Sequence, residues 1–201
     1  PERAESIIRA VKKVITVPLS VKIRLGWSDP TDCLSFAPRI EAAGADLVTV
    51  HGRTKAQGYS GVSDWKMIAR VKQAVQIPLL ANGDIHTPEA AREAMAVTGA
   101  DGILVARGAL GNPWVLRQME EMLATGRVET TITTAERQAA TLDHMRLAVE
   151  HYGDRAPVLM RKHLAWYWKG IPYAQELRKA LVQITSPDEM AGIYRDFSGR
   201  V

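Results

Sequence analysis

Four short apolar runs in this chain each end in polar residues that can bind anions or exchange protons. The residues at the four ends are, in order, Lys22 with Arg24, His51 with Arg53, Asn82 with Gly83 and Asp84, and Arg107 with Gly108. Ammonium and guanidinium groups bind phosphate, an imidazole can donate or accept a proton, and a glycine lets the backbone approach a ligand closely. A single polar residue at a strand end is more often solvated or salt-bridged, whereas four such ends at one place favour a binding site.

The elements that carry these residues form an internal repeat. The stretch VKKVITVPLSVKIRLG from residue 11 is echoed by VKQAVQIPLLANGDI from residue 71, and EAAGADLVTVHGR from residue 41 by AVTGADGILVARG from residue 96. In each copy an amphipathic segment ends at a turn and a nearly continuous apolar run follows, which is typical of a strand covered on both faces of a parallel sheet. The repeat predicts four strands, each followed by a helix, near residues 19–24, 46–51, 78–82 and 102–106.

Alternating strands and helices of this length are typical of a (β/α)8 TIM barrel. The chain shows four of the eight units, so we expect half of such a barrel, with the other half either before residue 1 or supplied by a second chain. The carboxyl ends of all barrel strands face one mouth, and the loops after the last two strands commonly bind phosphate through backbone N–H groups. The four polar ends are therefore expected to meet at this mouth, where Arg107 would add a charge-assisted contact to phosphate.

After Gly126 the pattern predicts helices only. Four are expected, over about 133–152, 157–170, 173–184 and from 187 onward. Thr133 and Glu136 form a capping box for the first, and proline near the start of the second and fourth is typical of a first helical turn. The predicted fold class is therefore α/β over residues 1–125, followed by an all-α helical bundle over residues 126–201.

Composition narrows the class of protein. Hydrophobic residues make up 46% of the chain and charged residues 24%, which is ordinary for a globular protein, and no apolar stretch approaches the roughly 20 residues that cross a bilayer. The lone Cys33 excludes an internal disulfide framework and a cysteine-based zinc site, so we expect a cytoplasmic protein with no metal and no membrane contact. The net charge of +4 permits a partner that carries phosphate.

Five motifs lie at the predicted strand ends and in the helical tail: VKIRLGW, VHGRT, IPLLANGDI, GADGILVARGALGNPW and MRKHLAWY. Together they resemble the tRNA-dihydrouridine synthase family, in its bacterial B-type branch. The resemblance implies an FMN-binding TIM barrel followed by a helical RNA-binding domain. It also implies an oxidoreductase that reduces the C5=C6 bond of a uridine in tRNA with hydride from NADPH, carried by the flavin.

By this resemblance, residues 1–125 are the C-terminal half of the FMN-binding barrel and residues 126–201 are the tRNA-binding domain. The N-terminal half, with the catalytic cysteine of the family, would lie upstream of this chain. No residue of the chain is therefore predicted to be catalytic, and we expect the fragment alone to be inactive. Cys33 lies at the start of a predicted helix, in SDPTDCLSFAPRIEAAG, and is interpreted as a small apolar helix residue.

Seven residues are implied by the resemblance to bind the flavin: Lys22, His51, Asn82, Gly83, Asp84, Ala106 and Arg107. Lys22 would reach the pyrimidine edge of the isoalloxazine, where a fixed cation stabilises the negative charge of the reduced ring. His51 would donate to the flavin or its phosphate, and Arg107 would hold the phosphate. Ala106 stands where the family has glycine, so its methyl group narrows the approach to the phosphate.

The helical tail carries a basic segment. Residues 155–179 contain six basic residues and one acid, Glu176. Within this segment Arg161, Lys162 and His163 match the RNA-facing stretch of the family, and we interpret them as contacts to tRNA phosphates.

The other side chains of this helix, among them Met160, Leu164 and Tyr167, recur at helical spacing and are assigned to the core together with one of the neighbouring tryptophans. Arg53, at the barrel mouth, is also a candidate contact to RNA, with a buried ion pair as the equal alternative, and the same pair of interpretations holds for Arg24.

Two other classes of function stay open at this point. A lysine on a barrel strand fits a Schiff-base aldolase with Lys22 as nucleophile, although the basic tail has no role in such an enzyme. Without the first half of the barrel, the chain also fits a catalytically inert RNA-binding fragment.

Overall fold

The structure is a computed structural model, and it describes residues 1–172 and 174–198. Position 173, where the third predicted helix of the tail begins, and positions 199–201 lie outside the described residues. The chain divides into two compact units, residues 1–108 with 115–128, and residues 109–114 with the chain from 129 onward. Within the described ranges, none of the helices has the length and apolar character that a bilayer crossing needs.

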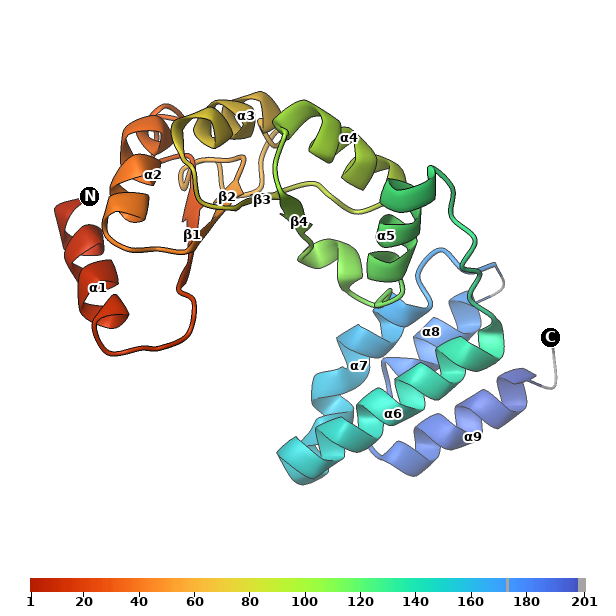
Figure 1. The fold of residues 1–201 in the computed structure, drawn as a ribbon. Coiled ribbons are helices and arrows are strands. Elements are labelled where there is room, and N and C mark those ends of the chain that lie inside the picture. The colour runs from red at the N-terminus through yellow and green to blue at the C-terminus, as the bar shows by residue number, and fades with distance from the viewer. Residues whose placement is uncertain (173, 199–201) are drawn as a thin grey trace. The chain divides into compact units, whose positions relative to one another are not determined.

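The first unit is an α/β structure built on a four-stranded parallel sheet (Figure 1). Its elements are, in chain order, α1 (Glu2–Lys12), β1 (Ser20–Arg24), α2 (Asp32–Ala42), β2 (Leu47–His51), α3 (Trp65–Ala74), β3 (Leu79–Asn82), α4 (Pro88–Thr98), β4 (Gly102–Leu104) and α5 (Val115–Thr125). The strand order β1-β2-β3-β4 confirms the four parallel strands that the repeat predicts. The fourth strand is shorter than predicted, because the chain turns after Val105 into a 3₁₀ helix over Arg107–Ala109.

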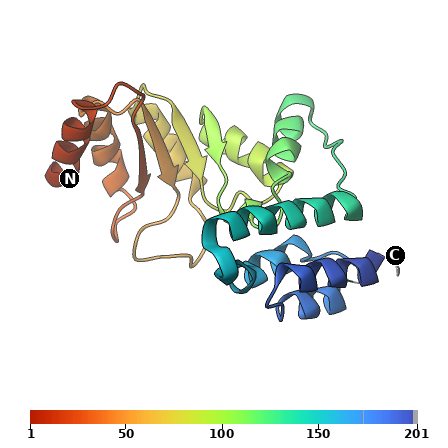
Figure 2. The same cartoon turned by 90° about the horizontal axis from the view of Figure 1, so that it is seen from below.

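Helices α2 to α5 line one face of this sheet, and Figure 2 shows the strands side by side. A right-handed crossover between each pair of neighbouring parallel strands places every connecting helix on the same face. On that face, Val48, Val50, Leu79 and Ala81 are fully buried. The opposite face carries the alternate residues of each strand, and these include the polar residues of the strand ends.

The strand register aligns the polar residues in two rows across the free face. Arg24 pairs with His51, His51 with Asn82, and Asn82 with Leu104. Two residues earlier along each strand, on the same face, Lys22 pairs with Thr49. The predicted strand ends therefore do lie side by side, as expected for the carboxyl edge of a parallel sheet.

The sequence repeat is also a structural repeat. Asp46 accepts a hydrogen bond from Leu19 N at 2.6 Å and pairs with Lys12, and Asp101 accepts one from Leu79 N at 2.7 Å and pairs with Lys72 at 2.8 Å. In both copies, the aspartate after Gly-Ala thus ties the start of its own strand to the start of the preceding strand. These pairs hold neighbouring strands in register.

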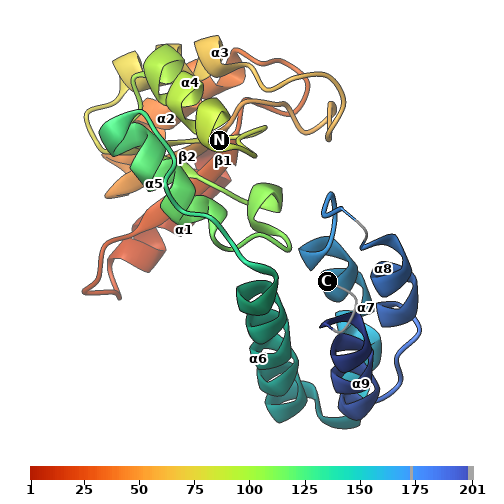
Figure 3. The same cartoon turned by 90° about the vertical axis from the view of Figure 1, so that its right-hand side faces the viewer.

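The second unit consists of helices packed around one core (Figure 3). Its elements are α6 (Thr134–Tyr152), α7 (Ala156–Tyr167), α8 (Gln175–Leu181) and α9 (Pro187–Ser198). The Thr133 and Glu136 capping box is present, because the Thr133 side chain accepts from Glu136 N and the Glu136 carboxylate accepts from Thr133 N. Helix α7 ends at Tyr167 rather than at Gly170, and α8 ends at Leu181.

The core of this unit contains the apolar residues that helical spacing predicts. Met160, Leu164 and Tyr167 are all buried, and of the two tryptophans it is Trp168 that is fully enclosed. The Trp168 indole donates to the Tyr194 hydroxyl at 3.1 Å, and that hydroxyl donates to Thr141 Oγ1 at 2.7 Å. Each buried polar group thereby has a partner, which avoids the cost of an unsatisfied donor.

Candidate functional site

A pocket of about 130 Å³ lies at the carboxyl ends of the strands in the first unit. Its walls include all seven residues predicted to bind flavin, namely Lys22, His51, Asn82, Gly83, Asp84, Ala106 and Arg107. The other lining residues are Arg24, Tyr59, Ile85, His86 and Leu104. The fold thus brings the predicted site residues together, and their individual roles stay predictions.

Lys22 and Arg24 supply two cations from the same strand. Alternate residues of a strand share a face, so both side chains point toward the pocket. Burial, and then the charge of Arg24, lower the pKa of Lys22. The Arg24 guanidinium donates to the carbonyls of Thr54 and Gly58, at 3.0 Å each, which orders the loop after β2.

His51 is neutral at physiological pH in this structure. Burial, and then the neighbouring charges of Arg24 and Lys22, lower its pKa to about 4. Its side chain is buried, and within the described residues Nδ1 has no hydrogen-bond partner. A buried ring nitrogen without a partner carries a desolvation cost, and Nδ1 is enclosed by the protein rather than open to the pocket.

Arg53 is a buried residue that stabilises the segments around the pocket. Its side chain is 3% exposed and donates to both carboxylate oxygens of Asp84, at 2.9 and 2.6 Å, and to the carbonyls of Ser60 and Gly61. Bidentate pairing of this kind is the strongest arrangement for a guanidinium and a carboxylate. The structure shows the buried ion pair, one of the two interpretations of Arg53, and the enclosed guanidinium disfavours the contact to RNA.

Asp84 forms the ion pair with Arg53 and also lines the pocket. Burial raises the pKa of its carboxyl, but hydrogen bonds from Arg53 and Ser63 N outweigh that effect, so the pKa is lowered overall. Asp84 has φ +58° and Gly83 has φ +114°. A Cβ at position 83 would lie 2.3 Å from Ser63 Oγ, so glycine is required where the chain turns beneath the pocket.

Arg107 stands at the opposite rim. Its guanidinium lies 4.1 Å from the centre of the Tyr59 ring and 3.9 Å from the nearest Asp84 carboxylate oxygen. Nearly half of its side chain is exposed. A cation that is oriented by an aromatic ring and a carboxylate, and yet open to solvent, is well placed to receive an anionic group.

In the second unit, the three residues predicted to contact RNA differ in their surroundings. Arg161 donates to the carbonyls of Ile184 and Gln183, so its guanidinium binds the chain after α8. Lys162 is exposed, and His163 is half-buried beside His144 and Trp166. Burial, and then His144, lower the pKa of His163.

Lys162 and His163 line a groove of about 790 Å³ between α6 and α7, which we call the α6–α7 groove. Its lining residues are His144, Leu147, Ala148, His151, Tyr152, Arg155, Leu159, Met160, Lys162 and His163. None of these residues is acidic, and two carry a permanent positive charge. The groove therefore has the charge and the aromatic and imidazole rings that favour RNA.

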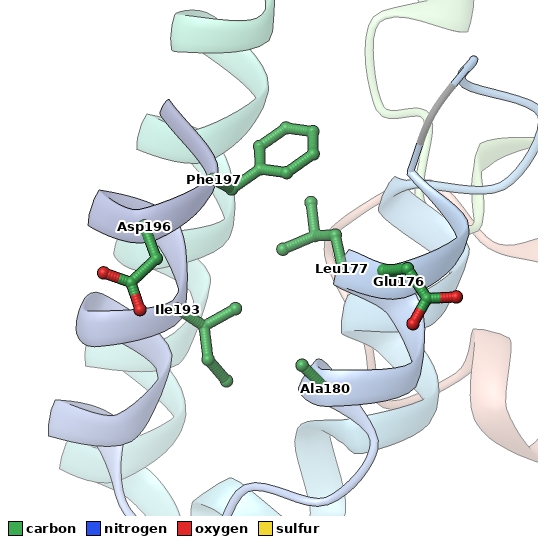
Figure 4. A pocket seen from close by; sticks show the side chains of 6 residues that line it. All are labelled: Glu176, Leu177, Ala180, Ile193, Asp196 and Phe197. Carbon is green, nitrogen blue, oxygen red and sulfur yellow. The ribbon is translucent and has the colours of Figure 1, made fainter. Parts of the chain in front are cut away.

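A second hollow of this unit has the opposite character. It measures about 220 Å³ between α8 and α9, and Figure 4 shows Leu177, Ile193 and Phe197 directed into it, with Glu176 and Asp196 at the rim. Carboxylates repel the phosphates of a nucleic acid. Within this unit, the α6–α7 groove is thus the better candidate surface for RNA.

Comparison with known proteins assigns the family. The model of the family described as dihydrouridine synthase (Dus) matches residues 1–198. The chain belongs to the dihydrouridine synthase family. This confirms the resemblance seen in the five motifs.

Relatives in the family are similar along nearly the whole chain. The probable tRNA-dihydrouridine synthase 1 of Synechocystis sp. is 44% identical over 190 residues, which cover 94% of this chain and 54% of the relative. The tRNA-dihydrouridine synthase B of Pseudomonas syringae pv. tomato is 39% identical over 193 residues, which cover 95% and 57%. The chain thus spans about half the length of the curated relatives it matches.

One solved structure outside the family is similar in fold. The crystal structure of phosphonopyruvate hydrolase aligns with a TM-score of 0.50 at 20% identity, covering 99% of this chain and 76% of the other. At this identity, the likeness concerns the fold alone, and it agrees with the α/β arrangement of the first unit.

Besides the apolar Ile85 and Leu104, the pocket wall contains two residues with hydrogen-bonding side chains that the sequence did not reveal. Tyr59 and His86 follow β2 and β3 and line the site. A lone aromatic in the glycine-rich loop KAQGYSG was the available signal for Tyr59, and no signal pointed to His86.

Cys33 has the surroundings of a structural residue. Its side chain is fully buried, its thiol contacts the Pro30 carbonyl at 3.2 Å, and burial raises its pKa to about 11. A protonated, enclosed thiol is inert as a nucleophile. Its interpretation as a small helix residue therefore agrees with its burial.

Proposed function

We propose that this chain is part of an FMN-dependent tRNA-dihydrouridine synthase, an oxidoreductase that reduces the C5=C6 bond of a uridine in tRNA with hydride derived from NADPH. Its first unit would be the second half of a (β/α)8 barrel and its second unit the tRNA-binding helical domain. The reducing compartment favoured by the lone Cys33 supports a cytoplasmic location.

One observation carries this proposal: all seven positions that match the flavin site of the family line a single pocket. The chemistry of that pocket fits FMN. Arg107 offers an exposed cation for a phosphate, Lys22 a cation for an anionic ring, and His51 an imidazole in the wall of the pocket. FMN, when bound, would supply the hydride that it receives from NADPH.

The residues of this chain would bind and orient the group. Lys22 would stabilise negative charge on the pyrimidine edge of the ring system. Arg107 would hold the phosphate, and the neutral imidazole of His51 would donate or accept one hydrogen bond without adding charge. Gly83 would let the backbone lie close beneath the ligand. The Arg53 and Asp84 pair would keep the rim of the site fixed.

The reduction also needs a general acid that protonates C5, because hydride addition at C6 leaves carbanion character at C5. Among the described strand-end residues none suits this task, since Lys22 is assigned to the flavin and His51 is neutral. We therefore place the acid, the cysteine of the family, in the part of the longer relatives that this chain does not match.

The sheet also has two open edges, because β1 and β4 each have a partner strand on one side only in the described residues. Open edges leave backbone groups unpaired and half of a barrel core uncovered. We propose that the 201 residues alone do not reduce uridine and that the missing N-terminal half of the barrel restores activity.

A direct experiment uses the full-length protein. We expect a flavin absorption band after purification, and formation of dihydrouridine when an unmodified tRNA transcript and NADPH are added. A colourless protein that does not take up FMN, or one that binds FMN but leaves every uridine of the transcript intact, would refute the proposal.

A Schiff-base enzyme is the second candidate, since the lowered pKa of Lys22 also suits a nucleophilic amine. Borohydride reduction in the presence of small carbonyl compounds separates the two. Covalent mass added at Lys22 would favour the aldolase, whereas an unmodified lysine with bound FMN would favour the synthase.

A further inference from the structure

Trp27 is an exposed aromatic residue next to the candidate site. It follows β1, and 72% of its surface is open to solvent. Lys55, from the loop after β2, lies with its ammonium 5.8 Å from the centre of the indole ring. A large exposed aromatic side chain with a cation beside it is the usual composition of a surface on which unpaired nucleobases stack.

The backbone around this pair is firmly held. Lys55 N donates to the Gly26 carbonyl at 2.9 Å and Ala56 N to the Trp27 carbonyl at 2.8 Å, so the loops after β1 and β2 stay joined beyond the strands. The Arg24 guanidinium adds bonds to Thr54 and Gly58. A ring on an ordered backbone loses little entropy when a ligand stacks on it.

Trp27 also borders a cleft of about 490 Å³ along β1 and α2. The apolar part of its wall includes Ile23, Leu25 and Phe36, and Asp32 lines it as well. Arg24 is the one residue named in the walls of both this cleft and the candidate site. The cleft follows the open edge of β1, where the proposed missing half of the barrel would pack, so it is not part of the stacking site.

We infer that Trp27 and Lys55 form a stacking site for an unpaired base of the RNA substrate, adjacent to the pocket that would hold the reacting uridine. The inference rests on the proposed function. Trp27 supplies the ring face and Lys55 contacts the phosphate beside the stacked base. Charge favours RNA as the occupant, because the Lys55 ammonium lies beside the exposed indole.

The experiment compares two probes on the full-length protein: a short fluorescein-labelled oligouridine, and an oligomer of equal length and charge whose sugars lack bases. Fluorescence anisotropy gives both affinities. We expect the parent protein to prefer the oligouridine by about tenfold or more, the range for one stacked base. Trp27→Ala should abolish most of this preference, and Trp27→Phe should retain part of it, because a smaller ring remains.

Lys55→Ala should act differently and weaken the binding of both probes to the same extent. It should also lower the slope of log affinity against log salt by about 0.7, the value for one phosphate on a single strand. Val62→Ala serves as the matched control, since Val62 is 81% exposed in the same loop and has no ring. Flavin content and the unfolding midpoint of each variant, measured in parallel, report on folding.

The outcomes separate this inference from the proposed function. A parent that binds neither probe nor tRNA would overturn both. The stacking site alone would be overturned if the parent protein reduces uridine in tRNA and the Trp27→Ala variant keeps the full preference for the probe with bases. That result would assign Trp27 to a polypeptide contact along β1.

Discussion

Arg53 in the first unit is held differently from Lys162 and Arg146 in the second unit. In the first unit, the Arg53 guanidinium is 3% exposed and is bound by Asp84 and two carbonyls, so it has one position. In the second unit, Lys162 is exposed, and Arg146 is 57% exposed and pairs only with residues of its own helix. A fixed charge network suits one small ligand in one pose, whereas mobile surface cations suit a long polyanion that is bound through many similar phosphates.

The largest effect expected from this contrast is on stability. Arg53→Ala should lower the free energy of unfolding by about 3 kcal/mol, because it leaves the Asp84 carboxylate without its partner. Urea denaturation measures this change. Arg146→Ala is the control in the second unit, and its solvated pairs should make the unfolding midpoint move far less. Equal shifts for the two variants would remove the distinction between the units.

The next effect concerns the ligand of the pocket. Arg107→Ala in the full-length protein should weaken FMN binding by about 1.5 to 3 kcal/mol, the range for a charge-assisted hydrogen bond to phosphate. Fluorescence titration with FMN measures the loss. Arg117→Ala is a suitable control, because Arg117 lies on α5 outside the pocket and is 74% exposed. Unchanged affinity in the Arg107 variant would exclude it as the phosphate ligand.

A smaller effect is expected from a single surface cation of the second unit. Lys162→Ala should weaken tRNA binding and reduce the slope of log affinity against log salt by about 0.9, one contact's worth on a duplex, while flavin content stays the same. Arg161→Ala should chiefly lower stability, since its guanidinium donates to the Gln183 and Ile184 carbonyls. An identical salt slope in parent and Lys162 variant would show that the α6–α7 groove does not bind RNA through this residue.

The last effect, which is absent at neutral pH and appears only as the pH is lowered, is the pH dependence contributed by His51. The folded state keeps His51 neutral down to about pH 4, whereas the unfolded chain takes up the proton near its ordinary pKa of 6.5. Between these values the unfolded state binds more protons, so this contribution to stability is complete above pH 6.5 and declines as the pH falls toward 4. His51→Asn should remove it, and the difference between the two curves of unfolding free energy against pH is the measurement. Parallel curves would show that His51 is as solvated in the folded state as in the unfolded one.

Local patterns in the sequence determined the elements. The repeated Val/Ile-Pro and Gly-Ala-Asp turns marked four parallel strands, and the Thr133 capping box marked the start of α6, because both depend on neighbouring residues. Alternation along the strands also placed Lys22 and His51 on the same face. The motifs identified the family, which the family model then confirmed.

Only the tertiary structure decided how the charges are used. The sequence proposes an anionic ligand for each of Arg53, Arg107 and Arg161, yet one is enclosed with Asp84, one lies open beside Tyr59, and one binds carbonyls after α8. The partners of each guanidinium come from segments distant along the chain, so no local pattern can reveal them. Burial and long-range hydrogen bonds, which only the folded chain sets, determine whether an arginine is a structural clamp or a ligand contact.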